Sequence, residues 1–309
     1  MHSLRRLSGT INRYCRCYLK RGLTSKSAEN EKVEVQPEKN IVVEQFEAIT
    51  TIGINRPDKK NCLDVATAQE LAEELDKFEN DQTSVAGVIH GVGGNFCSGY
   101  DLTEIAQYDG KNDEIIPQFG PLSNKLELSK KPLIAAISGY AVGVGFEIAL
   151  MCDLRVTEET AVLGFLNRRW GIPILCGGTV RLPALIGYSR AMEVILTGRC
   201  ISAEEALRWG LANEHTSHGA VLGRAVNLAR SFSKFPQKTL LADRASAHYA
   251  TFAAKQLEEA LQFEKDNASH LLFEEGIHGA KKFVAEGLGK HGKFHDLTEI
   301  DISFKPLDK

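Results

Sequence analysis

Short runs of apolar residues alternate with amphipathic segments along the chain, and this pattern predicts strands joined to helices. Four apolar runs of strand length lie at 41–43, 49–54, 85–89 and 132–137. The first two are close enough in sequence to form a hairpin. Residues 65–78 carry apolar side chains at helical spacing and follow Asp64, a residue that can cap a helix. Strands and helices in this mixed order predict an α/β protein.

The stretch 131–153 joins a buried strand to a helix through glycines. Gly143 and Gly145 lead into 146–151, a run with strong helix formers. The first N–H groups of such a helix have no intrahelical acceptor and lie at the positive end of the helix dipole, so they can bind a phosphate or a developing oxyanion. A dinucleotide-binding motif would need a third glycine where this chain has Ile148. A buried helix with glycines for close packing is the alternative.

A second glycine-rich loop, 91–101, follows the predicted strand at 85–89. Glycines permit close approach of the backbone, and loops of this kind often contact ligands. The chain thus contains two units in which a strand runs into a glycine-rich loop, and backbone donors from both could converge on one site. Tight turns without a binding role are the alternative.

After residue 153 the mixed pattern continues up to about residue 220. It predicts a strand at 154–156, a loop at 163–178, and helices near 189–197 and 203–209. Ser202 and Glu205 have the spacing of a capping box for the second of these helices. From residue 220 onward the pattern is almost entirely helical, with helices expected at 246–270 and 273–286.

The composition is that of an ordinary globular protein. The chain has 309 residues, of which 43% are hydrophobic and 25% charged, and its formal net charge is −3. This balance gives no support to nucleic-acid binding. No apolar run approaches the roughly 20 residues needed to cross a membrane. We therefore expect neither nucleic acid nor a membrane as a partner.

Residues 1–28 contain many Lys and Arg side chains and no Asp or Glu. An Arg-rich, acid-free N-terminus with several Ser and Thr residues is typical of an organelle transit peptide, and we expect the mitochondrial matrix as the location. A disordered basic arm is the alternative. The cysteines beyond this stretch show no metal-ligand spacing and predict free thiols in a reducing compartment, without a metal site: Cys62, Cys97, Cys152, Cys176 and Cys200.

Five motifs follow one another along the chain: NRPDKKNCLD, GNFCSGYDL, KPLIAAISGYAVGVGFEIALMCDLRV, GGTVRLPALIG and AMEVILTGRCISAEEALRWGLAN. Together they resemble the crotonase superfamily, the enoyl-CoA hydratase/isomerase proteins, over about residues 40 to 290. The resemblance implies a crotonase-like ββα spiral core at 36–235, after a transit peptide and linker at 1–35. It implies a helical C-terminal trimerisation region at 236–309, and hence a homotrimer or a dimer of trimers. An acyl-CoA thioester would be the substrate, with no separate cofactor.

The resemblance also implies an oxyanion hole that holds the thioester carbonyl as it becomes an enolate. Carried over residue by residue, its two backbone N–H donors fall on Tyr100 and Val144. Such a hole needs only positioned donors, and the loss of one typically costs ~10²–10³ in rate. The side chains of both residues would narrow the acyl pocket. Ser98, Gly99 and Gly145 adjoin the donors and are expected to contact the substrate.

Glu147 matches the first of two carboxylates that the family uses to activate water and deliver a proton. The second position holds Asn167, which can bind a water but cannot exchange a proton at neutral pH. Two alternatives to a hydratase therefore stay open. One is decarboxylation of a malonyl-type thioester, with Arg168 orienting the departing carboxylate. The other is a catalytically silent protein that binds CoA esters or a protein partner.

Three basic residues are candidates for binding the anionic parts of the substrate. Arg56 and Lys60 are expected to contact CoA phosphates, with solvated surface charge as the alternative. Arg168 could bind an anionic acyl group or a CoA phosphate, because guanidinium groups suit both anions. An ion pair at a subunit interface is the alternative for Arg168.

Overall fold

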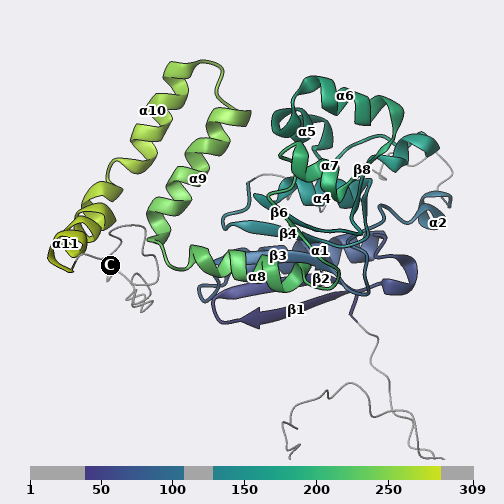
Figure 1. Cartoon of the computed structure of the whole chain (residues 1–309), viewed down its shortest axis with the longest axis horizontal. Helices are drawn as coiled ribbons and strands as arrows, with labels where there is room; N and C mark the ends of the chain where they lie inside the picture. Colours follow the sequence, from purple (N-terminus) through teal and green to yellow (C-terminus); the bar gives the residue numbers. More distant parts are fainter. Residues whose placement is uncertain (1–38, 108–127, 287–309) are drawn as a thin grey trace, which may run out of the picture. The chain divides into compact units, whose positions relative to one another are not determined.

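The computed structural model of the chain describes residues 39–107 and 128–286 (Figure 1). Strands β1 (Ile41–Phe46) and β2 (Ile49–Ile54) form the predicted hairpin, in which each residue of β1 lies opposite one of β2. The expected transit peptide and linker at 1–35 lie outside the described residues.

In the described part of the chain, the main sheet has six strands in the order β1-β2-β3-β4-β6-β9. The strands beyond the hairpin are β3 (Ala86–Gly91), β4 (Leu133–Ile137), β6 (Leu154–Glu158) and β9 (Glu214–Thr216). From β2 onward, neighbouring strands are parallel. Because parallel neighbours end at the same edge of a sheet, the loops that leave β3 and β4 are brought together there.

Both faces of the main sheet are covered by apolar packing, in agreement with the period of two along its strands. One face packs against α8 (Val221–Phe232) through Ile49, Val88, Ile134 and Val156. The other face packs against α1 (Val65–Asn80) and α4 (Val144–Met151) through Ile52, Ile89, Ala135 and Ile137. Every residue of α4 from 144 to 150 is buried, so this helix lies within the core.

Side-chain caps define the starts of two helices that follow loops. The carboxylate of Asp64 accepts hydrogen bonds from the N–H and the hydroxyl of Thr67, at 2.8 and 2.6 Å, which confirms the predicted cap of α1. The carboxylate of Asp101 accepts from the N–H of Thr103 at 3.1 Å and so caps the short α2 (Leu102–Ile105). Each cap satisfies an N–H that the helix itself leaves without an acceptor.

A second sheet escaped the analysis of the sequence pattern. Its strands are β5 (Tyr140–Val142), β7 (Val162–Gly164) and β8 (Cys200–Ser202). The prediction of a loop at 163–178 is therefore wrong at its start, and this range also contains a 3₁₀ helix at Leu166–Trp170. Helix α5 (Gly178–Ile186), which begins at the end of that range, was not predicted. Strands of three residues are too short for their period of two to show.

Helices α6 (Tyr188–Thr197) and α7 (Ala203–Arg208) confirm the predictions near 189–197 and 203–209. The hydroxyl of Ser202 caps α7 by accepting a hydrogen bond from the N–H of Glu205 at 3.2 Å. Helix α6 ends at Gly198, whose φ of 60° is in the left-handed region that favours glycine.

The C-terminal part of the described chain is helical, as predicted, but its helices are divided differently. They are α9 (Gln237–Phe252), α10 (Leu257–Ala268), a π-helical turn at Leu272–Gly276 and α11 (Ile277–Glu286). The prediction of one helix over 246–270 is wrong, because the chain reverses at 253–256. Helices α9 and α10 then pack together (Figure 1), with the rings of Tyr249 and Phe263 stacked 4.1 Å apart. Such long-range ring packing leaves no local signal at the break.

Candidate active site

The loop that follows β3 meets the end of β5 beside the start of α4. A Cβ added to Gly99 would lie 3.3 Å from the carbonyl oxygen of Val142, and one added to Gly143 would lie 3.5 Å from the Cα of Gly99. Both glycines have positive φ, 104° and 58°, a conformation that other residues rarely adopt. The glycine-rich loop after β3 and the glycine turn between β5 and α4 therefore converge in direct backbone contact.

The two predicted oxyanion donors lie where these two segments meet. Leu63 pairs with the loop that follows β3 through backbone hydrogen bonds. Its N–H donates to the carbonyl of Gly99, and its carbonyl accepts from the N–H of Asp101, each at 2.8 Å. Since successive N–H groups of extended backbone point to opposite sides, the N–H of Tyr100 points away from Leu63. Val144 is the first residue of α4, so its N–H has no intrahelical acceptor. Both donor residues line the same pocket.

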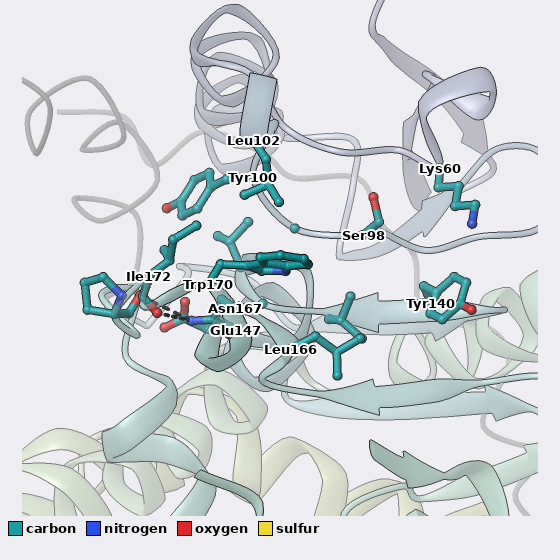
Figure 2. Close-up of a pocket in the computed structure, with 15 residues that line it drawn as sticks. Lys60, Ser98, Tyr100, Leu102, Tyr140, Glu147, Leu166, Asn167, Trp170 and Ile172 are labelled. Atoms are coloured by element: carbon teal, nitrogen blue, oxygen red, sulfur yellow. Dashed lines mark hydrogen bonds between the residues drawn. The ribbon is translucent and has the colours of Figure 1, made fainter. Parts of the chain in front are cut away.

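A pocket of about 260 Å³ opens between the two loops and the 3₁₀ helix (Figure 2). Its apolar lining comes from Leu102, Val142, Val144, Leu166, Trp170, Ile172 and Pro173. Its polar side chains are those of Lys60, Ser98, Tyr100, Tyr140, Glu147 and Asn167. Lys60 and Tyr140 lie at one end of the pocket as drawn in Figure 2, whereas Tyr100 and Ile172 lie at the other. A mostly apolar cleft with a few polar groups is typical of a small-molecule site.

Glu147, in the first turn of α4, is the one carboxylic acid among the described residues that line this pocket. Its side chain is held by two backbone donors, since Oε1 accepts hydrogen bonds from the N–H of Cys176 at 2.6 Å and of Gly178 at 3.0 Å. The residue is only 2% exposed. Burial raises the pKa of Glu147 from its ordinary value of 4.5 to about 7, against the opposing effect of the two N–H donors. A carboxyl with this pKa can both accept and donate a proton near neutral pH.

The phenol of Tyr100 and the thiol of Cys176 lie within hydrogen-bond distance of each other, at 3.1 Å. Burial raises the pKa of the Cys176 thiol to about 11, and it also raises the pKa of the Tyr100 phenol. Both groups are therefore neutral at physiological pH, so neither can serve as a base there. They form a neutral polar pair at the Tyr100 end of the pocket.

Asn167 lines the pocket from the 3₁₀ helix. Its Nδ2 donates hydrogen bonds to the backbone carbonyls of Ile172, at 2.8 Å, and Pro173, at 3.3 Å. The hydrogen bond to Ile172 is drawn as a dashed line in Figure 2, and it holds the amide nitrogen against the loop that follows the 3₁₀ helix. The residue adds a polar group to the pocket but no second acid.

Three of the predicted substrate contacts do not line the pocket. Arg56 forms an ion pair with Asp64 at 2.7 Å, and it supports the chain around the start of α1 instead of facing the pocket. Arg168 is exposed on the 3₁₀ helix. Gly145 packs against the next loop, because a Cβ at this position would lie 2.4 Å from the carbonyl oxygen of Cys97. The remaining predicted site residues, Lys60, Ser98, Gly99, Tyr100, Val144, Glu147 and Asn167, are brought together.

The analysis of the sequence missed the groups that hold α4 and its carboxyl in place. The N–H donors of Cys176 and Gly178 fix Glu147, but backbone groups carry no signal of residue type. Arg155 is buried in β6, and its guanidinium donates to the carbonyl of Cys152 at 2.6 Å, at the end of α4. Here a signal existed, since an arginine within an apolar strand is rarely buried without partners.

Within the described residues, no group of three or more His, Cys, Asp or Glu side chains is placed to hold a metal ion. None of the helices in these ranges combines the length and the apolar character that a membrane crossing demands.

The sheet order, the two converging loops and the buried carboxyl define an α/β protein of the crotonase fold. Residues 44–288 match the family described as enoyl-CoA hydratase/isomerase, and the chain belongs to this family. It is 31% identical over 240 residues to the mevalonyl-coenzyme A hydratase sidH of Aspergillus fumigatus. This alignment covers 76% of this chain and 88% of the relative. A crystal structure of an enoyl-CoA hydratase from Bacillus anthracis matches with a TM-score of 0.74 and 30% identity, over 80% of this chain and 97% of that one.

A third relative is the probable mitochondrial enoyl-CoA hydratase of Dictyostelium discoideum, which is 32% identical over 219 residues and covers 69% of this chain and 76% of the relative. The family and these relatives agree on the coarse function. The protein is an acyl-CoA-processing enzyme of the enoyl-CoA hydratase/isomerase type.

Proposed function

We propose that the protein adds water across the double bond of a 2-enoyl-CoA, with Glu147 as the single acid/base group. The observation that carries this proposal is the buried carboxyl with a pKa of about 7, in a pocket that the donors Tyr100 and Val144 also line. The names of the relatives support hydration over other reactions, since sidH and the Dictyostelium protein are both named hydratases. The reaction would belong to the lyases, and it needs no cofactor beyond the CoA of the substrate.

One carboxyl can balance the proposed reaction. The carboxylate of Glu147 takes one proton from water as the water oxygen bonds to C3, and the electrons of the double bond move into the thioester to form an enolate. The N–H groups of Tyr100 and Val144 stabilise the enolate oxygen. Glu147 then returns the proton to C2, and the carbonyl re-forms. Substrate and water become a 3-hydroxyacyl-CoA, and the carboxylate is regenerated.

An assay of the full chain with short and medium trans-2-enoyl-CoA esters tests this proposal. We expect loss of the conjugated thioester and formation of 3-hydroxyacyl-CoA at a rate well above that without protein. Binding of saturated acyl-CoA without turnover of any enoyl ester would instead support the silent CoA-binding alternative.

Decarboxylation of a malonyl-type thioester finds less support than hydration. The hypothesis depended on Arg168 as an anion site, but this side chain is exposed and does not line the pocket. Among the described residues of the lining the one cation is Lys60, which lies over the ring of Tyr140, 5.1 Å from its centroid, at the far end from Tyr100. Release of carbon dioxide from an alkylmalonyl-CoA in the same assay would revive the alternative.

We further propose that the protein is a homotrimer or a dimer of trimers, assembled through its C-terminal helices. Support comes from large apolar side chains that the single chain leaves exposed there: Leu257, Leu261, Leu272, Phe273 and Val284. Exposed apolar surface of this kind is typical of protein interfaces. Light scattering coupled to size-exclusion chromatography would measure the mass, and a monomer would contradict the proposal.

Import into the mitochondrial matrix is also a proposal. It is supported by the basic, acid-free segment 1–28 and by the names of relatives from Dictyostelium and human, which include the word mitochondrial. Fusion of residues 1–35 to a fluorescent reporter should direct it to mitochondria in cells. A diffuse cytosolic signal would contradict this proposal.

A further inference from the structure

Asn167 has a buried side-chain oxygen without a hydrogen-bond partner. Among the buried side-chain nitrogen and oxygen atoms of the described residues, only its Oδ1 has no hydrogen-bond partner. The atom lies beside the start of α4, because a Cβ added to Gly143 would be 3.9 Å from it. A buried acceptor without a donor is unfavourable, and natural proteins usually retain one where a ligand or a water supplies the donor.

The orientation of this amide is fixed by the loop that follows the 3₁₀ helix. Nδ2 donates to the carbonyls of Ile172 and Pro173, at 2.8 and 3.3 Å. Rotation of the amide by half a turn would bring Oδ1 to these same distances from two carbonyl oxygens, which are acceptors as well. Two acceptors cannot form a hydrogen bond with each other. Asn167 is therefore held with its oxygen away from the loop, as an acceptor that cannot become a donor.

The requirements of hydration match an acceptor of this kind. A water that adds to C3 has two hydrogens, of which one is removed by the base and the other stays on the oxygen as the hydroxyl of the product. Among the described residues that line the pocket, Glu147 is the one acid, and in the proposed reaction it takes the first hydrogen. The second hydrogen needs an acceptor that holds it without removing it. An amide oxygen meets this need, because it accepts hydrogen bonds but is not protonated at neutral pH.

We propose that Oδ1 of Asn167 accepts the hydrogen that stays on the oxygen at C3, so that the site recognises 3-hydroxyacyl-CoA esters through their hydroxyl group. The inference rests on the proposed hydratase function and names the residue that selects its product and positions its water. It also explains how a site with Asn167 in place of the second carboxyl can hold a water in a defined orientation.

Binding of three CoA esters of one chain length tests the proposal: the 3-hydroxyacyl, the 3-fluoroacyl and the saturated ester. Calorimetry would use full-length protein with Glu147→Gln, alone and combined with Asn167→Ala, so that no ligand is turned over. The 3-fluoroacyl ester resembles the hydroxy ester in size but has no hydrogen to donate. In the parent of this comparison, the Glu147→Gln protein with Asn167 intact, we expect the hydroxy ester to bind about 10-fold more tightly than the other two. This ratio is the effect of one hydrogen bond to a buried acceptor. Asn167→Ala should reduce this preference to about twofold or less.

The ratio of affinities separates the role of the acceptor from a shift of the loop. If Asn167→Ala acts only through loss of the hydrogen bonds to Ile172 and Pro173, the affinities of all three esters should fall together. The preference for the hydroxy ester over the other two therefore reports on Oδ1 alone. Equal affinities of the three esters in the parent would overturn the inference, and so would a preference that survives Asn167→Ala. Failure of the parent to bind any of the esters would refute the proposed function itself, which is a different outcome.

Discussion

Replacement of Glu147 by Gln should remove activity and stabilise the fold at the same time. The amide of Gln can present an oxygen to the N–H groups of Cys176 and Gly178, which hold Oε1 of Glu147 at 2.6 and 3.0 Å, so the packing of α4 is kept. Gln cannot exchange a proton. The loss of one general acid/base group lowers the rate by ~10²–10⁴, and we expect kcat to fall in this range.

The gain in stability follows from the raised pKa of Glu147. Between its ordinary value of 4.5 and about 7, the folded protein holds a proton that the unfolded chain has released. The contribution of this group to stability is therefore complete below pH 4.5 and is lost as the pH rises through 7. From pH 5 to pH 8 the free energy of unfolding falls by about 2.5 kcal/mol through this group. The Glu147→Gln protein does not undergo this loss, because Gln does not titrate.

Denaturant unfolding at pH 5 and pH 8 measures this effect as the change in the free-energy difference between variant and parent. Glu73→Gln is the matched control, since Glu73 is exposed on α1 and its carboxylate also accepts a hydrogen bond, from Gln69 at 2.9 Å. The difference for Glu147→Gln should grow with pH, whereas that for Glu73→Gln should stay nearly constant. A flat difference for Glu147→Gln would refute the argument from burial, and an unchanged kcat would assign the proton transfer to another group.

Three further predictions concern the pH profile and the framework of the site. The kcat/KM for hydration should rise with pH and level off above about 7, because the base must be ionised; a profile that is flat from pH 5 to 8 would contradict this role of Glu147. Gly145→Ala should destabilise the fold by about 1–3 kcal/mol, since its Cβ would overlap Cys97, while Gly223→Ala, with open space in α8, should be neutral or stabilising in the same melts. Asp64→Ala should cost about 1–2 kcal/mol through loss of the cap of α1, and an unchanged melting temperature would contradict it.

The elements that the sequence could predict are those with a local signal. The hairpin, β3, β4 and α1 have apolar runs or helical spacing long enough to recognise, and Asp64 marks the start of α1. The three-residue strands β5, β7 and β8 form because β7 pairs with both neighbours, which is a tertiary effect. Their residues therefore resemble a loop until the fold brings the strands together.

The candidate site divides in the same way. The glycine-rich loops could be found from residue types, because positive φ favours glycine, whereas Glu147 could be found only through the resemblance of its motif to the family. The role of Arg56 could not, since only the fold shows that Asp64 lies within 2.7 Å of its guanidinium. The orientation of Asn167 depends on the carbonyls of Ile172 and Pro173, and backbone acceptors leave no trace in a sequence.

The two ends of α4 differ, because backbone groups are satisfied by a side chain at one end and lack an intrahelical partner at the other. At its C-terminal end, the buried guanidinium of Arg155 donates to the carbonyls of Ala149, at 3.3 Å, and Cys152, at 2.6 Å. A cation there complements the negative end of the helix dipole and fixes the helix along its axis. At the opposite end, the N–H of Val144 has no intrahelical acceptor, and in the proposed reaction it donates to the enolate oxygen. The fold thus complements one end of a buried helix with the charge of Arg155, and the proposed reaction uses the positive end to stabilise the negative charge of the enolate.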